Sequence, residues 1–279
     1  MSGLDEVIEN WKRGTYYIGV FRESLPRIRA CHDLLADDES RRVLLELLQA
    51  YATTSGDPLA HLASACSAPC TLHHFVDPDG HHVMGTENPY FLEGVFPPTG
   101  DVVLLDGGAY VGDTIELASR ILGTHLCHYY AFEPNEETFG VLQETLARVS
   151  VPGSCFRAGL SDHSGSAPFS PDGSGSRVSA GGTETIELVD AGAFVANPPG
   201  PAPTFVKLDV EGQERAVLSS LLPYLRDMRP DLAVSAYHEL SDLWEIPLLV
   251  SEACPDYRVY LRHQSNYYSE TVCYATARD

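Results

Sequence analysis

Hydrophobic and polar residues alternate in a regular pattern from residue 101 to the end of this 279-residue chain. Five short apolar runs are separated by segments whose apolar residues recur at helical spacing. The apolar runs lie at 102–106, 128–133, 154–158, 204–209 and 231–237, and the helical segments lie near 113–122, 135–148, 211–226 and 240–253. Nearly continuous apolar strands that alternate with helices predict a parallel sheet covered on both faces.

Two further features complete this α/β region. The apolar runs at 257–263 and 270–277 have no helical segment between them, so they predict an antiparallel hairpin at one edge of the sheet. Residues 159–203 are rich in Gly, Ser and Pro, which predicts a loop excursion. We expect it near the carboxyl ends of the strands, where open α/β sheets bind their ligands.

Residues 1–96 follow a different pattern. The segment "DDESRRVLLELLQAY" predicts a helix that starts with acidic residues, and "TLHHFVDPDGHHVMG" predicts two short strands around an Asp-Pro-Asp-Gly turn. The Pro97-Pro98 pair marks a boundary. We therefore predict a mainly helical cap or lid region at 1–96 and an α/β domain at 97–279. Formation of a homodimer through residues 1–96, or simple extra packing, are the alternative roles of this region.

Charge and composition exclude several classes of partner. The chain has 39 acidic residues against 18 lysines and arginines, a net charge of −21, which repels phosphate backbones and anionic lipid heads. No nucleic-acid partner is therefore expected. No run of 18 apolar residues predicts a membrane span, and the polar amino terminus lacks the apolar segment of a secretory signal. With seven irregularly spaced cysteines, we expect a reducing cytoplasm.

The stretch "VVLLDGGAYVGDT", residues 102–114, predicts a buried strand that enters a glycine turn. Its spacing is Asp106-x-Gly108-x-x-x-Gly112, and such glycines let the backbone approach a ligand closely. A nucleotide-binding P-loop requires a lysine after the last glycine, whereas Asp113 follows here. The P-loop is therefore excluded.

A dinucleotide site such as that for NAD requires G-x-G-x-x-G. The best register uses Gly107, Ala109 and Gly112, so the middle glycine is missing. Asp113 would also face the pyrophosphate with a charge of the same sign. These two features argue against an NAD-dependent oxidoreductase, which we keep as an alternative.

S-adenosylmethionine suits the glycine turn better, because it carries a positive sulfonium, a positive ammonium and one carboxylate. Backbone N–H groups can bind the carboxylate, and Asp106 or Asp113 can bind the ammonium. Glu133 ends the second apolar run, where an acid can accept both hydroxyls of a ribose. NAD-binding folds place an acid at a similar point, so Glu133 alone does not separate the two cofactors.

The block "FVKLDVEGQE" holds the first group of catalytic candidates. Lys207 and Asp209 point to the same face of a strand, because side chains alternate. A lysine within an apolar strand is seldom buried without a partner, so we predict a Lys207–acid pair, structural or catalytic. Asp209 and Glu211 stand near the carboxyl end of the strand. Glu214 falls in the first turn of the next helix, where its effect on stability explains it.

The block "SAYHE" adds two more candidates. His238 and Glu239 come at the end of the fifth apolar run, and they arrive beside Asp209 if adjacent strands pair in order. Histidine is the side chain that most readily exchanges a proton near neutral pH.

Six segments in order resemble the FkbM-type methyltransferases of the class I Rossmann-like superfamily: "LLDGGAYVGDT", "AFEPNEETF", "GLSDHSG", "FVKLDVEGQE", "SAYHE" and "YRVYLRHQSNYYSETVCYATA". The resemblance implies a Rossmann-like class I methyltransferase sheet of seven strands, with the last strand antiparallel, beside a mainly helical N-terminal extension. It implies S-adenosylmethionine as donor and O-methylation of a hydroxyl on a small molecule, natural product or sugar. The cofactor residues implied are Asp106, Gly107, Gly108, Gly112, Asp113 and Glu133, with Gly159 and Ser161 bordering the adenine.

Two mechanisms fit the removal of the acceptor proton. In the first, His238 or Asp209 acts as a general base, with Lys207 and Glu211 as further catalytic candidates. In the second, Asp209, Glu211 and His238 or Glu239 hold Mg²⁺ or Mn²⁺, which acidifies the bound hydroxyl. We favour the metal-free mechanism. A methyltransferase-like binding module without catalytic activity is the third hypothesis for the whole chain.

Overall fold

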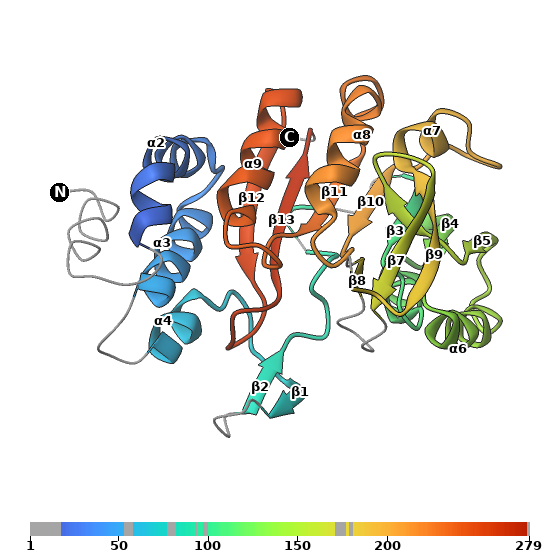
Figure 1. The fold of residues 1–279 in the computed structure, drawn as a ribbon, viewed down its shortest axis with the longest axis horizontal. Helices are drawn as coiled ribbons and strands as arrows, with labels where there is room; N and C mark the ends of the chain where they lie inside the picture. Colours follow the sequence, from blue (N-terminus) through green and yellow to red (C-terminus); the bar gives the residue numbers. More distant parts are fainter. Residues whose placement is uncertain are drawn as a thin grey trace. The chain divides into compact units, whose positions relative to one another are not determined.

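A computed structural model describes residues 18–52, 58–76, 82–92, 94–96, 100–170, 177–178 and 181–277. Figure 1 shows the helices and strands coloured along the sequence. Within the described residues, the chain divides into two compact units. The first contains residues 1–89, 236–252 and 258–274, and the second contains 90–235, 253–257 and 275–279. The boundary predicted at Pro97-Pro98 and the turn predicted at 77–80 lie outside the described residues, and the division at residue 96 stays a prediction.

A seven-stranded sheet has the order β12-β13-β11-β10-β3-β4-β5. Its strands are β3 (Val102–Gly107), β4 (Leu126–Phe132), β5 (Gly153–Phe156), β10 (Phe205–Leu208), β11 (Asp231–Ser235), β12 (Arg258–His263) and β13 (Thr271–Thr276). Strand β10 pairs in parallel with β3 and β11, and β4 pairs in parallel with β3 and β5. The last strand, β13, is antiparallel. The predicted strands, their parallel pairing and the hairpin at the sheet edge are confirmed.

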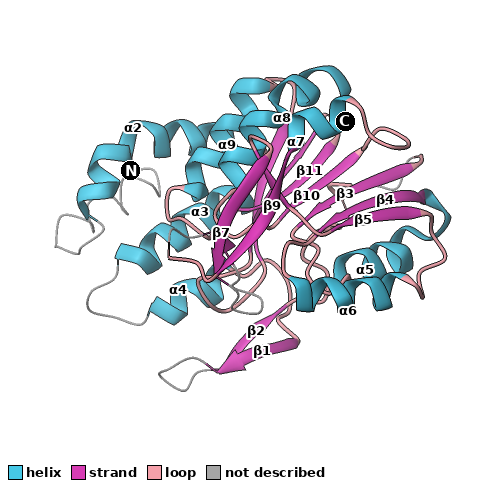
Figure 2. Cartoon of the chain, turned by 45° about the vertical axis from the view of Figure 1, so that its right-hand side comes forward, coloured by secondary structure: helices cyan, strands magenta, loops and turns pink. Residues whose placement is uncertain are grey.

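Helices of the second unit cover both faces of its strands. Figure 2 shows α5 (Asp113–Leu122) and α6 (Glu136–Leu146) on one face, and α7 (Ala191–Ala196) and α8 (Glu214–Met228) on the other. Strands β3 and β11 are buried at every residue, as expected for strands covered on both faces. Helix α6 begins at a polar cap, because the Asn135 side chain accepts hydrogen bonds from the backbone N–H groups of Glu137 and Thr138.

The prediction of a loop excursion at 159–203 is wrong. All four strands of a second sheet, of order β6-β9-β7-β8, lie within this segment. Its strands are β6 (Gly159–Ser161), β7 (Gly165–Ser170), β8 (Arg177–Val178) and β9 (Glu184–Asp190). Phe169, Ile186 and Leu188 form its small buried core. Ile186 and Leu188 alternate with exposed Thr185 and Glu187, so a half-buried strand was hidden within a composition typical of loops.

The first unit contains α2 (Ile18–Leu34), α3 (Asp38–Ala52), α4 (Pro58–Ala65), β1 (Leu72–Val76), β2 (His82–Gly85), α9 (Asp242–Ala253) and strands β12 and β13. Helix α3 confirms the helix predicted from "DDESRRVLLELLQAY", and its apolar residues Val43, Leu44, Leu47 and Leu48 are buried. Strands β1 and β2 pair antiparallel, which confirms the predicted strand pair. None of the helices described here is long and apolar enough to cross a membrane.

Candidate cofactor-binding and active site

The glycine loop, residues 108–112, follows β3 and has two positions that favour glycine. Gly108 and Gly112 have φ values of 75° and 86°, in the left-handed region that other residues rarely adopt. A Cβ atom on Gly108 would also overlap the carbonyl oxygen of Asp209. The loop is therefore packed directly against the segment that follows β10; the predicted approach of these glycines to a ligand stays a prediction.

Hydrogen bonds tie the glycine loop to the end of β4. The N–H groups of Gly108 and Ala109 both donate to the Phe132 carbonyl, at 3.0 and 2.9 Å. The N–H of Tyr110 donates to the Glu133 carboxylate at 3.0 Å. These three amides thus have acceptors within the protein. Helix α5 begins without a side-chain cap, so a ligand carboxylate would be bound by its first-turn amides rather than by the loop itself.

Glu133 lies directly after β4 and is a buried carboxylate held in one orientation. Its side chain accepts hydrogen bonds from the N–H of Asn135 at 2.8 Å and from the hydroxyl of Thr138 at 2.9 Å, in addition to the bond from Tyr110. Burial raises the pKa of Glu133 above its ordinary value, and the three hydrogen bonds oppose that shift. Glu133 is therefore a buried, oriented carboxylate rather than an exposed acid at the end of a strand.

A cleft of about 290 Å³ opens next to Pro134, the residue that follows Glu133. Its other lining residues are Glu136 at the start of α6, Arg157 after β5, and residues 184–187 of β9. Arg157 forms an ion pair with Glu136 at 2.8 Å. The second sheet, which the sequence did not predict, thus supplies one wall of this cleft.

Lys207 and Asp106 form a buried ion pair, which confirms the predicted Lys207–acid pair. They are directly opposite in the β10–β3 register, and Lys207 Nζ lies 2.9 Å from Asp106 Oδ1. Their side chains are 2% and 0% exposed. Burial alone would lower the pKa of Lys207, but the charges of Asp106 and Asp209 raise it above its ordinary value. Lys207 is therefore a charged group in the interior.

The Lys207 ammonium also contacts the glycine loop and a tyrosine. It donates to the carbonyls of Gly107 at 3.3 Å and Gly108 at 2.6 Å. It lies 5.1 Å from the ring centroid of Tyr90, within the range of a cation–π interaction. The hydroxyl of Tyr90 donates to Asp209 Oδ2 at 2.8 Å. Tyr90 was not predicted as a site residue; it lies in "NPYFLEGVFPP", just before β3.

A strained turn connects β10 to α8. Glu211 has a φ of 53° and Gly212 a φ of 92°. Glu214 is fully buried, and its two carboxylate oxygens accept hydrogen bonds from the N–H of Val210 at 2.7 Å and of Gly212 at 3.1 Å. Glu214, for which the sequence indicated a stabilising role, thus holds this turn in place.

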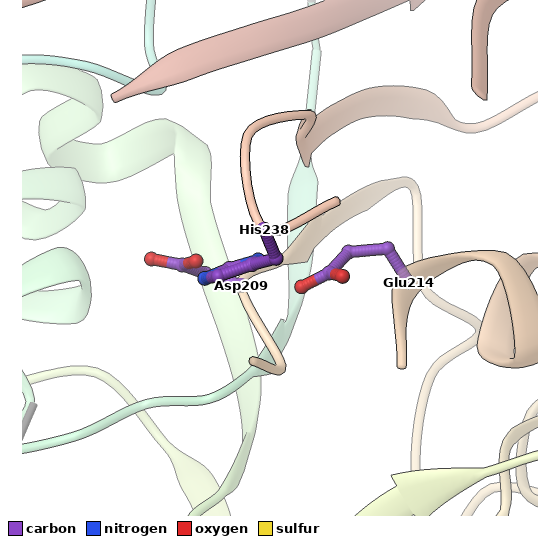
Figure 3. A group of neighbouring side chains, drawn as sticks. All are labelled: Asp209, Glu214 and His238. Carbon is purple, nitrogen blue, oxygen red and sulfur yellow. The ribbon is translucent and has the colours of Figure 1, made fainter. Parts of the chain in front are cut away.

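Figure 3 shows how Glu214 and Asp209 are presented, one from the start of α8 and one from the segment after β10. Each offers one oxygen to a group that could hold a metal ion, and these oxygens lie within 4.8 Å of each other. His238 is the third side chain labelled in Figure 3. Glu211 and Glu239, the other two predicted ligands, are not members of this group.

The remaining predicted residues have the following positions. His238 belongs to the first unit, is half-buried, and its ring lies 4.2 Å from that of Tyr237. Glu239 is exposed. Gly159 and Ser161 begin and end β6, and the buried Ser161 hydroxyl donates to Asp162 at 3.3 Å. Asp113 is the exposed first residue of α5.

Comparison with known proteins gives three consistent similarities. The family model described as "Methyltransferase FkbM domain" matches residues 106–268. Over 144 residues, the chain is 34% identical to the hexuronic acid methyltransferase AglP of Haloferax volcanii, which covers 47% of this chain and 59% of that protein. The crystal structure of methyltransferase FkbM from Methylobacillus flagellatus KT superposes with a TM-score of 0.72 at 21% identity.

The structural match covers 94% of this chain and 62% of the Methylobacillus chain. This chain therefore spans less than two thirds of the length of either protein. At this low identity the structural match supports the fold alone, while the family match covers more than half of the chain and includes the glycine loop and both candidate catalytic blocks.

Proposed function

The chain belongs to the FkbM methyltransferase family, and from this premise we propose that it transfers a methyl group from S-adenosylmethionine to a hydroxyl group of a sugar or other small molecule. The observation that carries the proposal is the joining of the glycine loop to Glu133. One hydrogen bond, from the Tyr110 N–H, connects the loop to a buried acid at the end of the next strand. Residues 106–114 contain no lysine or arginine, which suits a cationic ligand better than a polyphosphate.

Each part of the cofactor has a group of suitable charge. Glu133 would accept the ribose hydroxyls, because its carboxylate is already oriented by three donors. The uncapped first turn of α5 would bind the amino-acid carboxylate, and Asp113 at that turn would bind the ammonium. The nucleoside would lie toward the cleft beside Pro134, with Gly159 and Ser161 in the neighbouring sheet.

Methyl transfer to a hydroxyl requires alignment of the oxygen behind the methyl group and removal of the proton. We propose Asp209 and His238 as the residues for the second task. The Tyr90 hydroxyl donates to Asp209 Oδ2 and thereby orients this carboxylate. Most of the rate enhancement would come from holding the two reactants in line.

Asp209 and Glu214 have the oxygen donors that a divalent cation prefers, but those of Glu214 already accept other hydrogen bonds. Oxygen donors suit Mg²⁺ or Mn²⁺, and Asp209 and Glu214 supply them. Both oxygens of Glu214, however, accept backbone hydrogen bonds that hold the turn. We therefore propose a metal-free reaction; a bound cation would add Lewis-acid activation of the hydroxyl.

The acceptor is proposed to be a sugar. The AglP relative is described as a hexuronic acid methyltransferase, and the two chains share 34% identity over 144 residues. The net charge of −21 disfavours phosphate-rich acceptors such as nucleic acids.

Calorimetric titration with S-adenosylhomocysteine, the demethylated cofactor, tests the proposal directly. The wild type should bind it and should not bind NADH. Glu133→Gln should weaken binding at least tenfold, about 1.4 kcal/mol, because it removes a charge from the ribose anchor. Glu137→Gln, a change at a nearby exposed acid, is the matched control and should bind as the wild type does. Wild-type protein that binds no S-adenosylhomocysteine would exclude the function. Transfer of labelled methyl groups to sugar acceptors, with EDTA and with Mg²⁺, would follow.

A further inference from the structure

Lys207 is a residue whose role the proposed reaction does not use. It is 2% exposed, so it does not present its ammonium to a substrate. Its four described contacts are to Asp106, to the carbonyls of Gly107 and Gly108, and to the ring of Tyr90. Every one of these partners belongs either to the glycine loop and the strand that leads into it, or to the residue that holds Asp209.

We propose that Lys207 is a positioning residue that fixes the glycine loop in the conformation required for cofactor binding, and that Asp106 serves as its counter-charge rather than as a cofactor ligand. This inference rests on the proposed function, because the ligand in question is S-adenosylmethionine. Lys207 and its four partners all belong to the second unit.

The geometry explains why a lysine suits this position. The ammonium donates hydrogen bonds to the carbonyls of Gly107 and Gly108, and it lies 2.9 Å from Asp106 Oδ1 as an ion pair. The Gly107 carbonyl also accepts the N–H of Asp209 at 3.0 Å. On the other side of the loop, the amides of Gly108 and Ala109 donate to Phe132. The loop is therefore fixed through its carbonyls by β10 and through its amides by β4.

Asp106 is placed to stabilise the ammonium and not to contact a ligand. Its side chain is 0% exposed, and a buried lysine without an opposite charge would be strongly disfavoured. Of the two acids predicted to bind the cofactor ammonium, only Asp113 is exposed, which leaves that role to Asp113.

The test uses the double variant Lys207→Met/Asp106→Asn. Both changes preserve approximate shape and remove both charges, so neither charge is left buried alone, and the protein should fold. Arg262→Met/Asp37→Asn is the matched control, because Arg262 is also buried and paired with Asp37 at 2.6 Å but has no described contact with the glycine loop. Asp106→Asn alone, which keeps Lys207 and its carbonyl contacts, isolates the role of Asp106.

Two measurements are made on each full-length variant. Hydrogen exchange of the ligand-free protein reports on the Gly108, Ala109 and Tyr110 amides, and calorimetry reports the affinity for S-adenosylhomocysteine. The Lys207→Met/Asp106→Asn variant should exchange these amides at least tenfold faster and bind at least tenfold more weakly. The Arg262→Met/Asp37→Asn control should change neither quantity by more than about twofold.

Unchanged exchange in the Lys207→Met/Asp106→Asn variant would overturn the positioning role, as would faster exchange with wild-type affinity. Asp106→Asn alone leaves the Lys207 ammonium buried without its counter-charge, so it should speed exchange of the loop amides and weaken binding together. A tenfold loss of affinity with unchanged loop exchange would make Asp106 a direct ligand, and wild-type values of both quantities would exclude its role as counter-charge. If the wild type itself binds no S-adenosylhomocysteine, the proposed function fails, while the exchange measurement still decides whether Lys207 holds the loop.

Discussion

Glu214 provides a sharp test of how the β10–α8 turn is held. Its two carboxylate oxygens accept hydrogen bonds from Val210 and Gly212 in a fully buried setting, and Glu211 between them has a left-handed φ of 53°. Glu214→Ala removes both acceptor oxygens, so the N–H groups of Val210 and Gly212 lose their hydrogen-bond acceptors. We expect a substantial loss of folding stability that does not depend on cofactor or metal.

The magnitude follows from the two hydrogen bonds. A hydrogen bond to an ionised group contributes about 1.5–3 kcal/mol, so the Glu214→Ala loss is about 3–6 kcal/mol. The unfolding entropy of about 2.1 cal/mol/K per residue gives about 0.6 kcal/mol/K for 279 residues, so Tm should fall by about 5–10 °C. Glu214→Gln keeps one acceptor oxygen and should lose about half as much.

Differential scanning calorimetry in EDTA and in Mg²⁺ makes the measurement. Glu137→Ala is the matched control, because Glu137 is an exposed acid in the first turn of α6 and its removal tests only the helix-dipole contribution, below about 1 kcal/mol. A Glu214→Ala protein that melts within 1 °C of the wild type in EDTA would refute the reasoning. A loss of stability seen only in Mg²⁺ would instead identify Glu214 as a metal ligand.

Three further predictions concern strain and titration. Glu211→Gly should relieve the left-handed φ of 53° and raise stability by about 1 kcal/mol in urea unfolding, whereas a decrease would show that the Glu211 side chain stabilises the turn. His263 is buried, and burial lowers its pKa to about 4. The unfolded chain protonates this residue near pH 6.5, so stability should be full above that pH and fall by about 3 kcal/mol between pH 6.5 and 4; a His263→Gln variant should lack this part of the slope in urea unfolding. Burial would raise the pKa of Asp37, but its bonds to Arg262 and Ser40 lower it to about 2, so its contribution is present above about pH 4 and is lost toward pH 2. Arg262→Met should raise that pKa measurably in an NMR titration, and an unchanged value would exclude the ion pair as the cause.

The local sequence was sufficient where one segment carries a complete physical signal. The apolar runs that became β3, β4 and β10 could be read from their continuity, and the helices between them from their apolar spacing. The glycines at 108 and 112 permit the left-handed conformations found there, so the sequence marks where such a turn is possible. A lysine within the apolar strand β10 required a partner of opposite charge, and this requirement holds whichever acid supplies it.

Only the tertiary structure decided which distant segments contact each other. The partner of Lys207 is Asp106 because the register of β10 on β3 places them opposite each other, and strand register depends on the whole sheet. Tyr90 became a functional candidate only when it was found between Lys207 and Asp209. The second sheet escaped prediction because β6 and β7 are short and contain Gly and Ser, and because the alternating strand β9 follows a Gly- and Ser-rich stretch typical of loops; their pairing with one another makes them strands. Periodicity records which face of a segment is buried, whereas contacts between segments depend on loop closures and packing that no short stretch of sequence contains.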